Sequence, residues 1–463
     1  MNSTPTIPTE FRQIVVLLQA PCRHETHHNT VMSTALHTLQ RVFGYPAFRG
    51  AQEAIIAHLM GGKSALVLMP TGGGKSLCYQ IPALLLPGIT LVVSPLIALM
   101  QDQVMSLRRR GVPAAQLNAT LARHENRRLQ EDLLAGRLKL LYVSPERLAQ
   151  PAFLALLDRL QARQQLSLFA IDEAHCIAQW GHDFRPEYRK LSVLHQHYPS
   201  VPRVALTATA DPDTRQEILE QLQLRADQQY VASFDRPNLH YGICPKLNPG
   251  AQIETFLLER HAGDSGIIYC QSRRQVEHAA LWLQSRGWSS LPYHAGLGMD
   301  QRECHQQQFV QEKGVIMVAT VAFGMGVDKP DVRFVIHLDS PRNLEGYYQE
   351  TGRAGRDGGV AEALMLFHPA DLMALRLRIQ QTQRSPDRQV ADLNRLEALA
   401  RYCRSDSCRR RTLLRYFGEE STGRCHTCDN CNPDYRTWCG PEHRNHAITF
   451  AADRFTPGIR RTR

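Results

Sequence analysis

The stretch Met69-Pro70-Thr71-Gly72-Gly73-Gly74-Lys75-Ser76 decides the fold of this chain. An apolar run, 65–69, precedes it and a helical pattern follows it, which is the context that a phosphate-binding loop requires. Three consecutive glycines let backbone N–H groups approach phosphate oxygens closely. Lys75 is suited to the β- and γ-phosphates of a nucleotide, and Ser76 to Mg²⁺. The sequence therefore predicts that ATP and Mg²⁺ bind at Thr71–Ser76.

Short apolar runs alternate with helical stretches on both sides of this loop. Strands that alternate with helices predict parallel sheets covered by helices on both faces. Two such sets predict two α/β domains in tandem, with a link near Ser233–Tyr241, where Pro237 interrupts the pattern. The expected strands are 65–69, 90–94, 140–143, 168–172 and 204–207, then 266–269, 315–319, 334–338 and 363–367.

Two acidic residues, Asp172 and Glu173, end the apolar run 168–172 and precede Ala174 and His175. A buried strand that ends in carboxylates places them at the carboxyl edge of its sheet, beside the phosphate loop. We expect Asp172 to hold Mg²⁺ through water. We expect Glu173 to polarise the attacking water as a general base.

Two arginines spaced by three, Arg353 and Arg356, lie in the stretch 349–356 of the second set. An arginine that reaches across a domain cleft stabilises charge on the transferred γ-phosphoryl group and is worth ~10³–10⁵ in rate. We expect Arg356 to be this catalytic finger and Arg353 its helper. The alternative is a solvated basic helix face.

These motifs, in this order, resemble those of the RecQ family of DNA helicases, from about Phe43 to Cys431. Pro70-Thr71, in place of the early glycine of a phosphate loop, is typical of superfamily 2 helicases. The resemblance implies an α/β fold of two tandem RecA-like domains with parallel sheets, followed by a small helical zinc-binding module. It also implies ATP-driven 3′-to-5′ movement on single-stranded DNA.

The stretch 43–52 looks like the adenine-binding motif of this family. The resemblance implies that Tyr45 stacks on the base and that Arg49 and Gln52 bind it. A glutamine can read the adenine edge with two hydrogen bonds. Gly50-Ala51 stand where the family has Pro-Gly, so the loop is expected to be looser. Further family motifs match at 94–103 (Ia), 144–147 (Ib), 206–210 (III), 293–296 and 319–330 (V).

The stretch 176–186 resembles the aromatic-rich loop of RecQ helicases. Aromatic faces stack single-stranded bases for ~1–3 kcal/mol each, and Arg185 can pair with phosphate. The resemblance implies that single-stranded and partly duplex DNA is the partner. The alternative is a small satellite core around Trp180 and Phe184. The expected DNA-binding residues are Trp180, His182, Phe184 and Arg185.

Four of the twelve cysteines cluster near the end with the spacing C-x16-C-x2-C-x2-C. Four thiolates suit a closed, structural Zn²⁺ site. The resemblance implies such a site, with an Arg-rich helix, 409–411, after the first ligand. Cys403 and Cys439 are outside the family pattern, and Cys439 is an alternative fourth ligand. The expected zinc ligands are Cys408, Cys425, Cys428 and Cys431.

The formal net charge of +10 and the pI of about 9.1 suit a polyanionic partner, although many soluble proteins are basic. The twenty uncharged residues Ile81–Met100 have the length of a membrane span but contain Pro82, Pro87 and Pro95, which break a helix. We therefore expect no membrane association and a cytoplasmic protein, associated with the nucleoid if bacterial.

The domain organisation follows from these patterns. We expect a first RecA-like domain at 32–235, a second at 236–370, a zinc-binding module at 371–431 and a basic tail of uncertain structure at 432–463. Residues 1–31 are expected to be a disordered extension, with Met32 as an alternative start. The group Cys22, His24, His27 and His28 could bind a metal, but an unstructured tail is favoured.

The function expected from the residues and the resemblance is an ATP-dependent 3′-to-5′ DNA helicase in recombination and repair. Single-strand-binding and repair proteins are expected partners. Longer family members continue into a winged helix, for which residues 432–463 leave no room. One alternative is therefore a truncated DNA-binding remnant that hydrolyses ATP but unwinds poorly. Another is a superfamily 2 RNA helicase.

Overall fold

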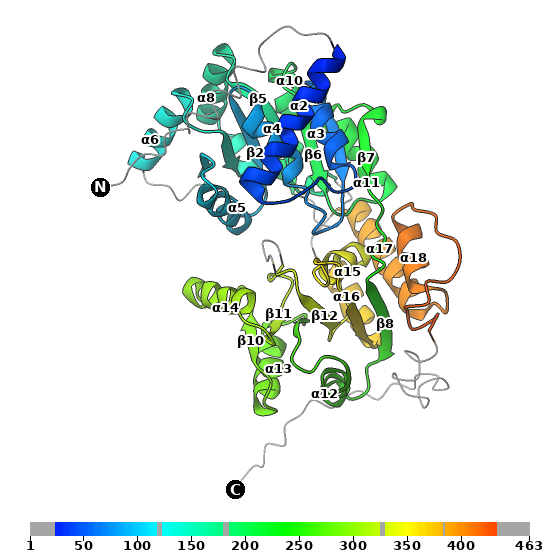
Figure 1. Ribbon diagram of the computed structural model, residues 1–463. Coiled ribbons are helices and arrows are strands. Elements are labelled where there is room, and N and C mark those ends of the chain that lie inside the picture. The colour runs from blue at the N-terminus through cyan, green and yellow to red at the C-terminus, as the bar shows by residue number, and fades with distance from the viewer. Residues whose placement is uncertain (1–23, 118–122, 179–184, 325–328, 383–384, 433–463) are drawn as a thin grey trace.

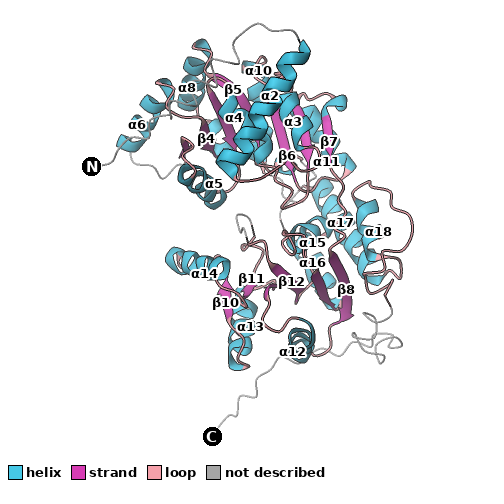
Figure 2. Cartoon of the chain, in the orientation of Figure 1, coloured by secondary structure: helices cyan, strands magenta, loops and turns pink. Residues whose placement is uncertain are grey.

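The computed structural model describes residues 24–117, 123–178, 185–324, 329–382 and 385–432. They form two sheets with helices packed around each, and a small helical module beside the second sheet (Figure 1). Figure 2 shows helices on both faces of each sheet. No helix in these ranges is long and apolar enough to cross a membrane.

The first sheet has the strand order β3-β4-β2-β5-β6-β1-β7, and all its strands are parallel. Its side chains alternate between two cores, so that Ala65 and Val67 of β1 face one and Leu66 and Leu68 the other. The strands are β1 Ala65–Leu68, β2 Ile89–Val93, β3 Ala114–Leu117, β4 Leu140–Val143, β5 Leu166–Ile171, β6 Arg203–Thr207 and β7 Gln229–Val231.

Helices cover both faces of this sheet, as expected for parallel strands joined by helical crossovers. They are α2 His24–Thr38, η1 Leu39–Phe43, α3 Gln52–Met60, α4 Leu77–Leu85, α5 Ile97–Arg109, α6 Arg123–Leu134, α7 Pro145–Leu148, α8 Pro151–Ala162, η2 Ala174–Ile177, α9 Pro186–Arg189, α10 Ser192–His197, α11 Pro212–Leu222 and η3 Ala226–Gln228.

The second sheet is also parallel, with the order β10-β11-β9-β12-β13-β8. Gly266 in β9 leaves room for the Phe334 ring, which a Cβ atom would overlap. The elements are β8 Leu239–Pro245, α12 Pro249–Arg260, β9 Ser265–Tyr269, α13 Arg273–Ser285, β10 Ser290–Tyr293, α14 Met299–Gln311, β11 Ile316–Ala319, β12 Val332–His337, α15 Leu344–Thr351 and β13 Ala361–Phe367.

The third part consists of α16 Pro369–Gln381, α17 Pro386–Arg404, α18 Arg409–Tyr416 and the cysteine-containing segment up to residue 432. Figure 1 shows α18 beside β8 and near α15. The α/β fold of two parallel-sheet domains followed by a helical module is therefore confirmed.

All nine strands predicted from apolar runs are present, with ends that differ by at most two residues. Four strands were not predicted: β3, β7, β8 and β10. These four are the edge strands of the two sheets. An edge strand has one side open to solvent and so lacks the continuous apolar run that marks a central strand.

The start of the chain differs from expectation. Helix α2 begins at His24, so residues 24–31, assigned to a disordered extension, are helical. Cys22 and the other residues before His24 lie outside the described ranges, as does the tail from 433 to 463. The link between the two sheets agrees with the sequence, because β8 begins at Leu239, within the predicted 233–241. The exact domain limits stay predictions.

Candidate functional site

The phosphate loop joins β1 to α4 at the carboxyl edge of the first sheet. Ser76 is the N-cap of α4, and a helix N-terminus favours anions. Gly72 and Gly74 have φ of +81° and +77°, which L side chains rarely adopt. A Cβ atom on Gly74 would also overlap the amide of Gln52. The loop therefore requires glycine at these positions for its shape.

Lys75 is partly buried over the loop. Its Nζ donates hydrogen bonds to the carbonyl oxygens of Met69, at 3.0 Å, and Pro70, at 3.3 Å. Burial lowers the pKa of Lys75, and the charges of Glu173 and Asp172 oppose that shift. This placement agrees with the sequence prediction that Lys75, Asp172 and Glu173 lie together at the phosphate loop.

The two carboxylates follow β5 in the next turn of the chain. Burial, and then the charge of Glu173, raises the pKa of Asp172 to about 7. Burial also opposes ionisation of Glu173, but His175, Lys75 and Arg353 outweigh it and hold the pKa of Glu173 below its usual value. Carboxylate and hydroxyl oxygens are the ligands that Mg²⁺ prefers. Asp172 and Ser76 therefore fit a magnesium ion at this edge of the sheet.

His175 connects the carboxylates to the next strand. Its Nδ1 lies 2.9 Å from Oγ1 of Thr207 and 3.3 Å from Oε2 of Glu173. Thr207 Oγ1 in turn donates to the carbonyl of Thr209 and accepts from the Thr209 N–H. The motif at 206–210 is thus joined to the acidic motif through a buried histidine. No role was predicted for His175, because a single histidine after two acidic residues carries no spacing signal.

The arginines of the second domain reach the phosphate loop. Arg353 is only 6% exposed, and its charge acts on Glu173. The side chain of Arg356 lies against the phosphate loop, where a Cβ atom on Gly72 would stand 3.1 Å from Arg356 Cγ. The charge of Arg356 also acts on Lys75. The structure thus brings together the two arginines and the acidic pair that the sequence selected separately.

The proposed base-binding residues have other contacts in this conformation. Gln52 is buried, and its Nε2 lies 3.2 Å from the carbonyl oxygens of both Gly73 and Gly74. Its Oε1 accepts a hydrogen bond from the Arg49 N–H at 2.9 Å. Tyr45 is 43% exposed, with the Arg49 guanidinium 6.0 Å from its ring centroid. Binding of adenine by Gln52 stays a prediction, and it requires these bonds to be exchanged.

The aromatic loop is described only at its two ends, 176–178 and 185–186. Trp180, His182 and Phe184 lie outside the described residues. Arg185 is described, and its Nη1 donates to the carbonyl of Pro95 at 2.9 Å. Pro95 belongs to the family motif at 94–103, so Arg185 joins this motif to the end of the aromatic loop.

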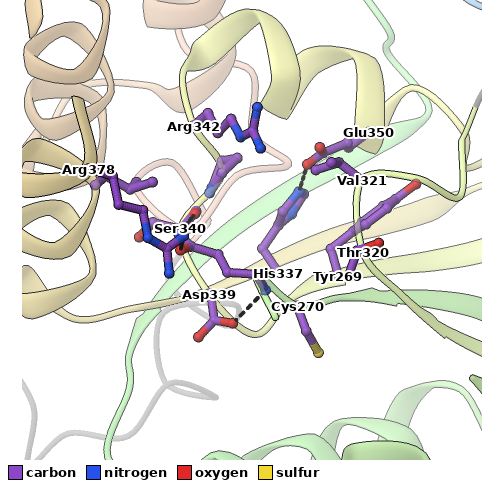
Figure 3. Close-up of a pocket in the computed structure, with 13 residues that line it drawn as sticks. Tyr269, Cys270, Thr320, Val321, His337, Asp339, Ser340, Arg342, Glu350 and Arg378 are labelled. Carbon is purple, nitrogen blue, oxygen red and sulfur yellow. Dashed lines mark hydrogen bonds and ion pairs between the residues drawn. The ribbon is translucent and has the colours of Figure 1, made fainter. Parts of the chain in front are cut away.

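A pocket opens at the carboxyl ends of β9, β11 and β12 in the second domain (Figure 3). Inside it, His337 Nε2 and Glu350 Oε2 are 2.7 Å apart. Arg378 of α16 donates to Gln271 Oε1 at 2.9 Å, and Arg342 also lines the pocket. The two arginines are suited to an anionic group, while Asp339 and Glu350 give the rest of the lining negative charge. Arg342 and Arg378 were not predicted from the sequence, since they come from a loop and a helix without a shared motif.

The four predicted cysteines converge. The Sγ atoms of Cys408, Cys425, Cys428 and Cys431 all lie within 4.8 Å of one another. Zinc bound tetrahedrally with Zn–S distances of about 2.3 Å requires sulfurs about 3.8 Å apart. The Arg409 N–H also donates to Cys428 Sγ at 3.4 Å. The donor set therefore fits Zn²⁺. Cys439 lies outside the described residues.

The arginine-rich helix α18 anchors the cysteine module to the second sheet. Arg409 and Asp429, both buried, form an ion pair with Nε–Oδ1 3.0 Å. Asp429 Oδ2 also accepts from the Ile243 N–H in β8 at 3.0 Å, and the Asp429 N–H donates to Tyr241 at 3.0 Å. Arg409 therefore has a structural role, because it holds Asp429 against β8.

Comparison with known proteins supports this arrangement. Residues 49–218 match the DEAD/DEAH box helicase family, 250–358 the helicase conserved C-terminal domain and 369–432 the RecQ zinc-binding family. The ATP-dependent DNA helicase RecQ of Bacillus subtilis is 40% identical over 403 residues, covering 87% of this chain and 67% of the relative. The chain belongs to the RecQ helicase family.

Other RecQ relatives are longer than this chain. The ATP-dependent DNA helicase RecQ of Pasteurella multocida is 49% identical over 405 residues, which cover 88% of this chain and 63% of the relative. The same protein of Haemophilus influenzae is 48% identical, with 86% and 63% covered. The chain thus spans about 63% of the length of these two relatives.

Solved structures share the RecQ chain's fold. The helicase MrfA bound to DNA superposes with a TM-score of 0.61 at 19% identity, covering 80% of this chain and 56% of that one. The DEAD-box helicase Mss116 bound to single-stranded RNA gives 0.60 at 14% identity, with 91% and 93% covered. At these identities the likeness establishes the tandem RecA-like fold.

Proposed function

We propose that this protein is an ATP-dependent DNA helicase that moves 3′-to-5′ on single-stranded DNA and separates duplexes, in recombination and repair. One observation carries the proposal: Arg353 and Arg356 of the second domain lie at the phosphate loop and acidic pair of the first. An ATP site completed by two domains links hydrolysis to their relative movement. The relatives named ATP-dependent DNA helicase support DNA as the partner.

The proposed hydrolysis uses the residues around the loop. Thr71–Ser76 bind the phosphates, and Lys75 exchanges its bonds to the Met69 and Pro70 carbonyls for phosphate oxygens. Glu173 accepts a proton from the attacking water. Arg356, assisted by Arg353, stabilises charge on the γ-phosphoryl group. Mg²⁺, when bound at Ser76 and Asp172, neutralises charge on the phosphates.

The proposed recognition of the nucleotide base uses Tyr45, Arg49 and Gln52. Because Gln52 contacts the phosphate loop, it can also couple the binding of adenine to the conformation of the residues that hold the phosphates. The cysteine module, with zinc at Cys408, Cys425, Cys428 and Cys431, is proposed to be structural, since four thiolates leave no open ligand position.

The proposed DNA path crosses the carboxyl edges of both sheets. Trp180, His182, Phe184 and Arg185 would contact bases and phosphate on the first domain. The Arg342 and Arg378 side of the pocket would face the strand on the second. We place the protein in the cytoplasm, at the nucleoid if bacterial, with single-strand-binding and repair proteins as partners.

A strand-displacement assay with a Lys75→Ala variant tests this function. The substrates are DNA duplexes with a 3′ or a 5′ single-stranded tail, and an RNA duplex, each with and without ATP. We expect the wild-type protein to separate the 3′-tailed DNA only with ATP, and Lys75→Ala to bind that DNA without separating it. Lys63→Ala, at an exposed lysine just before β1 and therefore at the other end of this strand from the loop, is the matched control.

The other outcomes identify the alternatives. Preference for the RNA duplex would indicate an RNA helicase. DNA-stimulated ATP hydrolysis without strand separation would indicate a remnant that unwinds poorly. Equal activity of Lys75→Ala and wild type would contradict the ATP mechanism.

A further inference from the structure

We propose that Arg236, in the segment between the two sheets, positions the arginine loop 352–356, and that the cysteine module braces Arg236 through Arg410. Arg236 is a positioning residue, because its guanidinium binds the backbone that carries Arg353 and Arg356. The inference rests on the proposed function, since it assigns a role in the ATP hydrolysis that Arg356 assists.

The guanidinium of Arg236 binds three carbonyl groups of the loop. Its Nη1 donates to Gly352 at 3.2 Å, and its Nη2 donates to Ala354 at 2.8 Å and Gly355 at 2.9 Å. The planar guanidinium can satisfy several acceptors in a fixed geometry, which a lysine cannot do. These carbonyls flank Arg353 and directly precede Arg356, so Arg236 fixes the backbone from which both side chains extend.

A second side chain of the same segment holds the far side of the loop. Asn238 Nδ2 lies 2.8 Å from the carbonyl oxygens of both Gly355 and Gly359. Gly355 has φ +58°, and a Cβ atom there would overlap the Asn238 amide. The approach of the segment to the loop is therefore too close for any residue but glycine at 355.

Arg410 connects this segment to the cysteine module. It lies two residues after the first expected zinc ligand, Cys408, in α18. Its Nη2 is within 3.2 Å of the Arg236 carbonyl and 2.8 Å of the Leu239 carbonyl. Its Nε lies 3.3 Å from Oδ1 of Asp235. A continuous set of contacts thus runs from the cysteine cluster through the connecting segment to the arginine loop.

The consequence is a specific kinetic effect. Displacement of a catalytic group by about 1 Å costs on the order of 10²-fold in rate. Loss of the three hydrogen bonds of the Arg236 guanidinium should therefore lower kcat for DNA-stimulated ATP hydrolysis by about 10- to 100-fold. KM for ATP and the Kd for DNA should stay unchanged, because the phosphate loop and the proposed DNA path keep their own contacts.

A double-mutant cycle tests the proposal. We would measure kcat, KM for ATP and the Kd for a 3′-tailed DNA duplex in Arg236→Gln, Arg356→Ala and the double variant. If Arg236 acts through the arginine loop, the double variant has the same kcat as Arg356→Ala alone. Additive losses, an unchanged kcat in Arg236→Gln, or a raised KM as the main effect would each overturn the proposal.

Controls separate positioning from folding. Arg225→Gln changes an exposed arginine of the first domain, at the start of η3, whose partner is Asp227, and should retain wild-type kcat. Arg236→Lys keeps the positive charge but not the planar guanidinium, and its kcat should lie between those of Arg236→Gln and wild type. If Arg236→Gln does not fold, Asn238→Ala replaces it in the cycle and must give the same non-additivity, or the proposal fails.

The experiment also distinguishes this inference from the proposed function. A wild-type protein that hydrolyses ATP, loses that activity in Arg356→Ala and keeps it in Arg236→Gln contradicts the positioning role alone. A wild-type protein without DNA-stimulated hydrolysis contradicts both. The role of Arg410 is tested in the same way. Arg410→Gln should lower kcat when introduced into the wild-type protein, but should lower it no further when introduced into Arg236→Gln. An additive effect would show that Arg410 does not act through Arg236.

Discussion

At the residue scale, the proposed hydrolysis of ATP depends on charges that are partly buried together. Lys75, Asp172 and Glu173 come from two loops of one sheet, and Arg353 and Arg356 from the other sheet. These residues were predictable because each motif has a fixed spacing on the chain. The contacts of Arg236 and Gln52 were not, because bonds from a side chain to distant carbonyl groups leave no pattern in the sequence.

The proposed general-base role of Glu173 predicts that Glu173→Gln retains ATP and DNA binding but hydrolyses ATP about 10²- to 10⁴-fold more slowly, since an amide cannot accept the proton. Single-turnover hydrolysis at saturating ATP and DNA measures this. Glu131→Gln, at an exposed glutamate of α6, is the control. A rate within about twofold of wild type would show that Glu173 is not the general base, because general-base catalysis contributes about 10²-fold or more.

The phosphate loop gives a second prediction, because Gly62 and Gly74 have similar φ values of +73° and +77° but different surroundings. Ala at Gly62, where nothing lies within 4 Å, should cost only the backbone strain of ~1–2 kcal/mol. Ala at Gly74 should cost more and weaken ATP binding, because its Cβ atom overlaps the Gln52 amide. Urea unfolding measures the loss of stability in each variant, and titration with ATP measures the loss of affinity. Equal losses in the two variants would contradict the expected overlap with the Gln52 amide.

At the element scale, the central strands were predictable and the edge strands were not. Central strands such as β2 and β5 are buried on both faces and read as apolar runs. Edge strands such as β3 and β10 mix polar residues with apolar ones. The end of the strand pattern near residue 370 and the cysteine cluster were evident in the sequence. The contacts of the helical module with α15 were not, since they join residues far apart in the chain.

Helix α15, which leads to the arginine loop, is held by a buried carboxylate. Glu345 is 2% exposed, and its Oε1 accepts from Arg395 Nε at 3.1 Å and from the Tyr416 hydroxyl at 2.7 Å. Glu345→Gln should destabilise the protein by ~3–5 kcal/mol, because a buried arginine loses its partner charge. Tyr416→Phe should cost less, ~1.5–3 kcal/mol, since it removes one bond to a charged group.

Urea denaturation of both variants measures these losses. Tyr416→Phe is a suitable comparison because the ring keeps its contact with Phe417, at 5.3 Å between centroids. A Tyr416→Phe variant less stable than Glu345→Gln would mean that the ring, and not the carboxylate, holds α15 in place.

At the scale of the whole molecule, the cysteine module contacts the second sheet, the connecting segment and the first domain. The Arg215 guanidinium of α11 donates to the Phe417 carbonyl at 2.6 Å, and Glu419 accepts from the Ser233 hydroxyl at 2.7 Å. Zinc would thus stabilise more than its own module. Zinc binding contributes ~10–16 kcal/mol in small modules.

Cys425→Ser is accordingly expected to lose zinc, to melt at a lower temperature and to expose the segment 405–432 to protease. Metal analysis, thermal unfolding and limited proteolysis check these three effects. Cys304→Ser, at an exposed cysteine of α14, should behave as wild type. Full zinc occupancy in a stable Cys425→Ser protein would contradict the ligand assignment.

The central claim is that one ATP site is completed by an arginine from the second domain. Single-turnover ATP hydrolysis by Arg356→Ala, with saturating ATP and 3′-tailed DNA, tests it most directly. The account predicts that ATP still binds and that the rate falls by ~10³-fold or more. Hydrolysis at the wild-type rate would show that the first domain acts alone and would contradict the account.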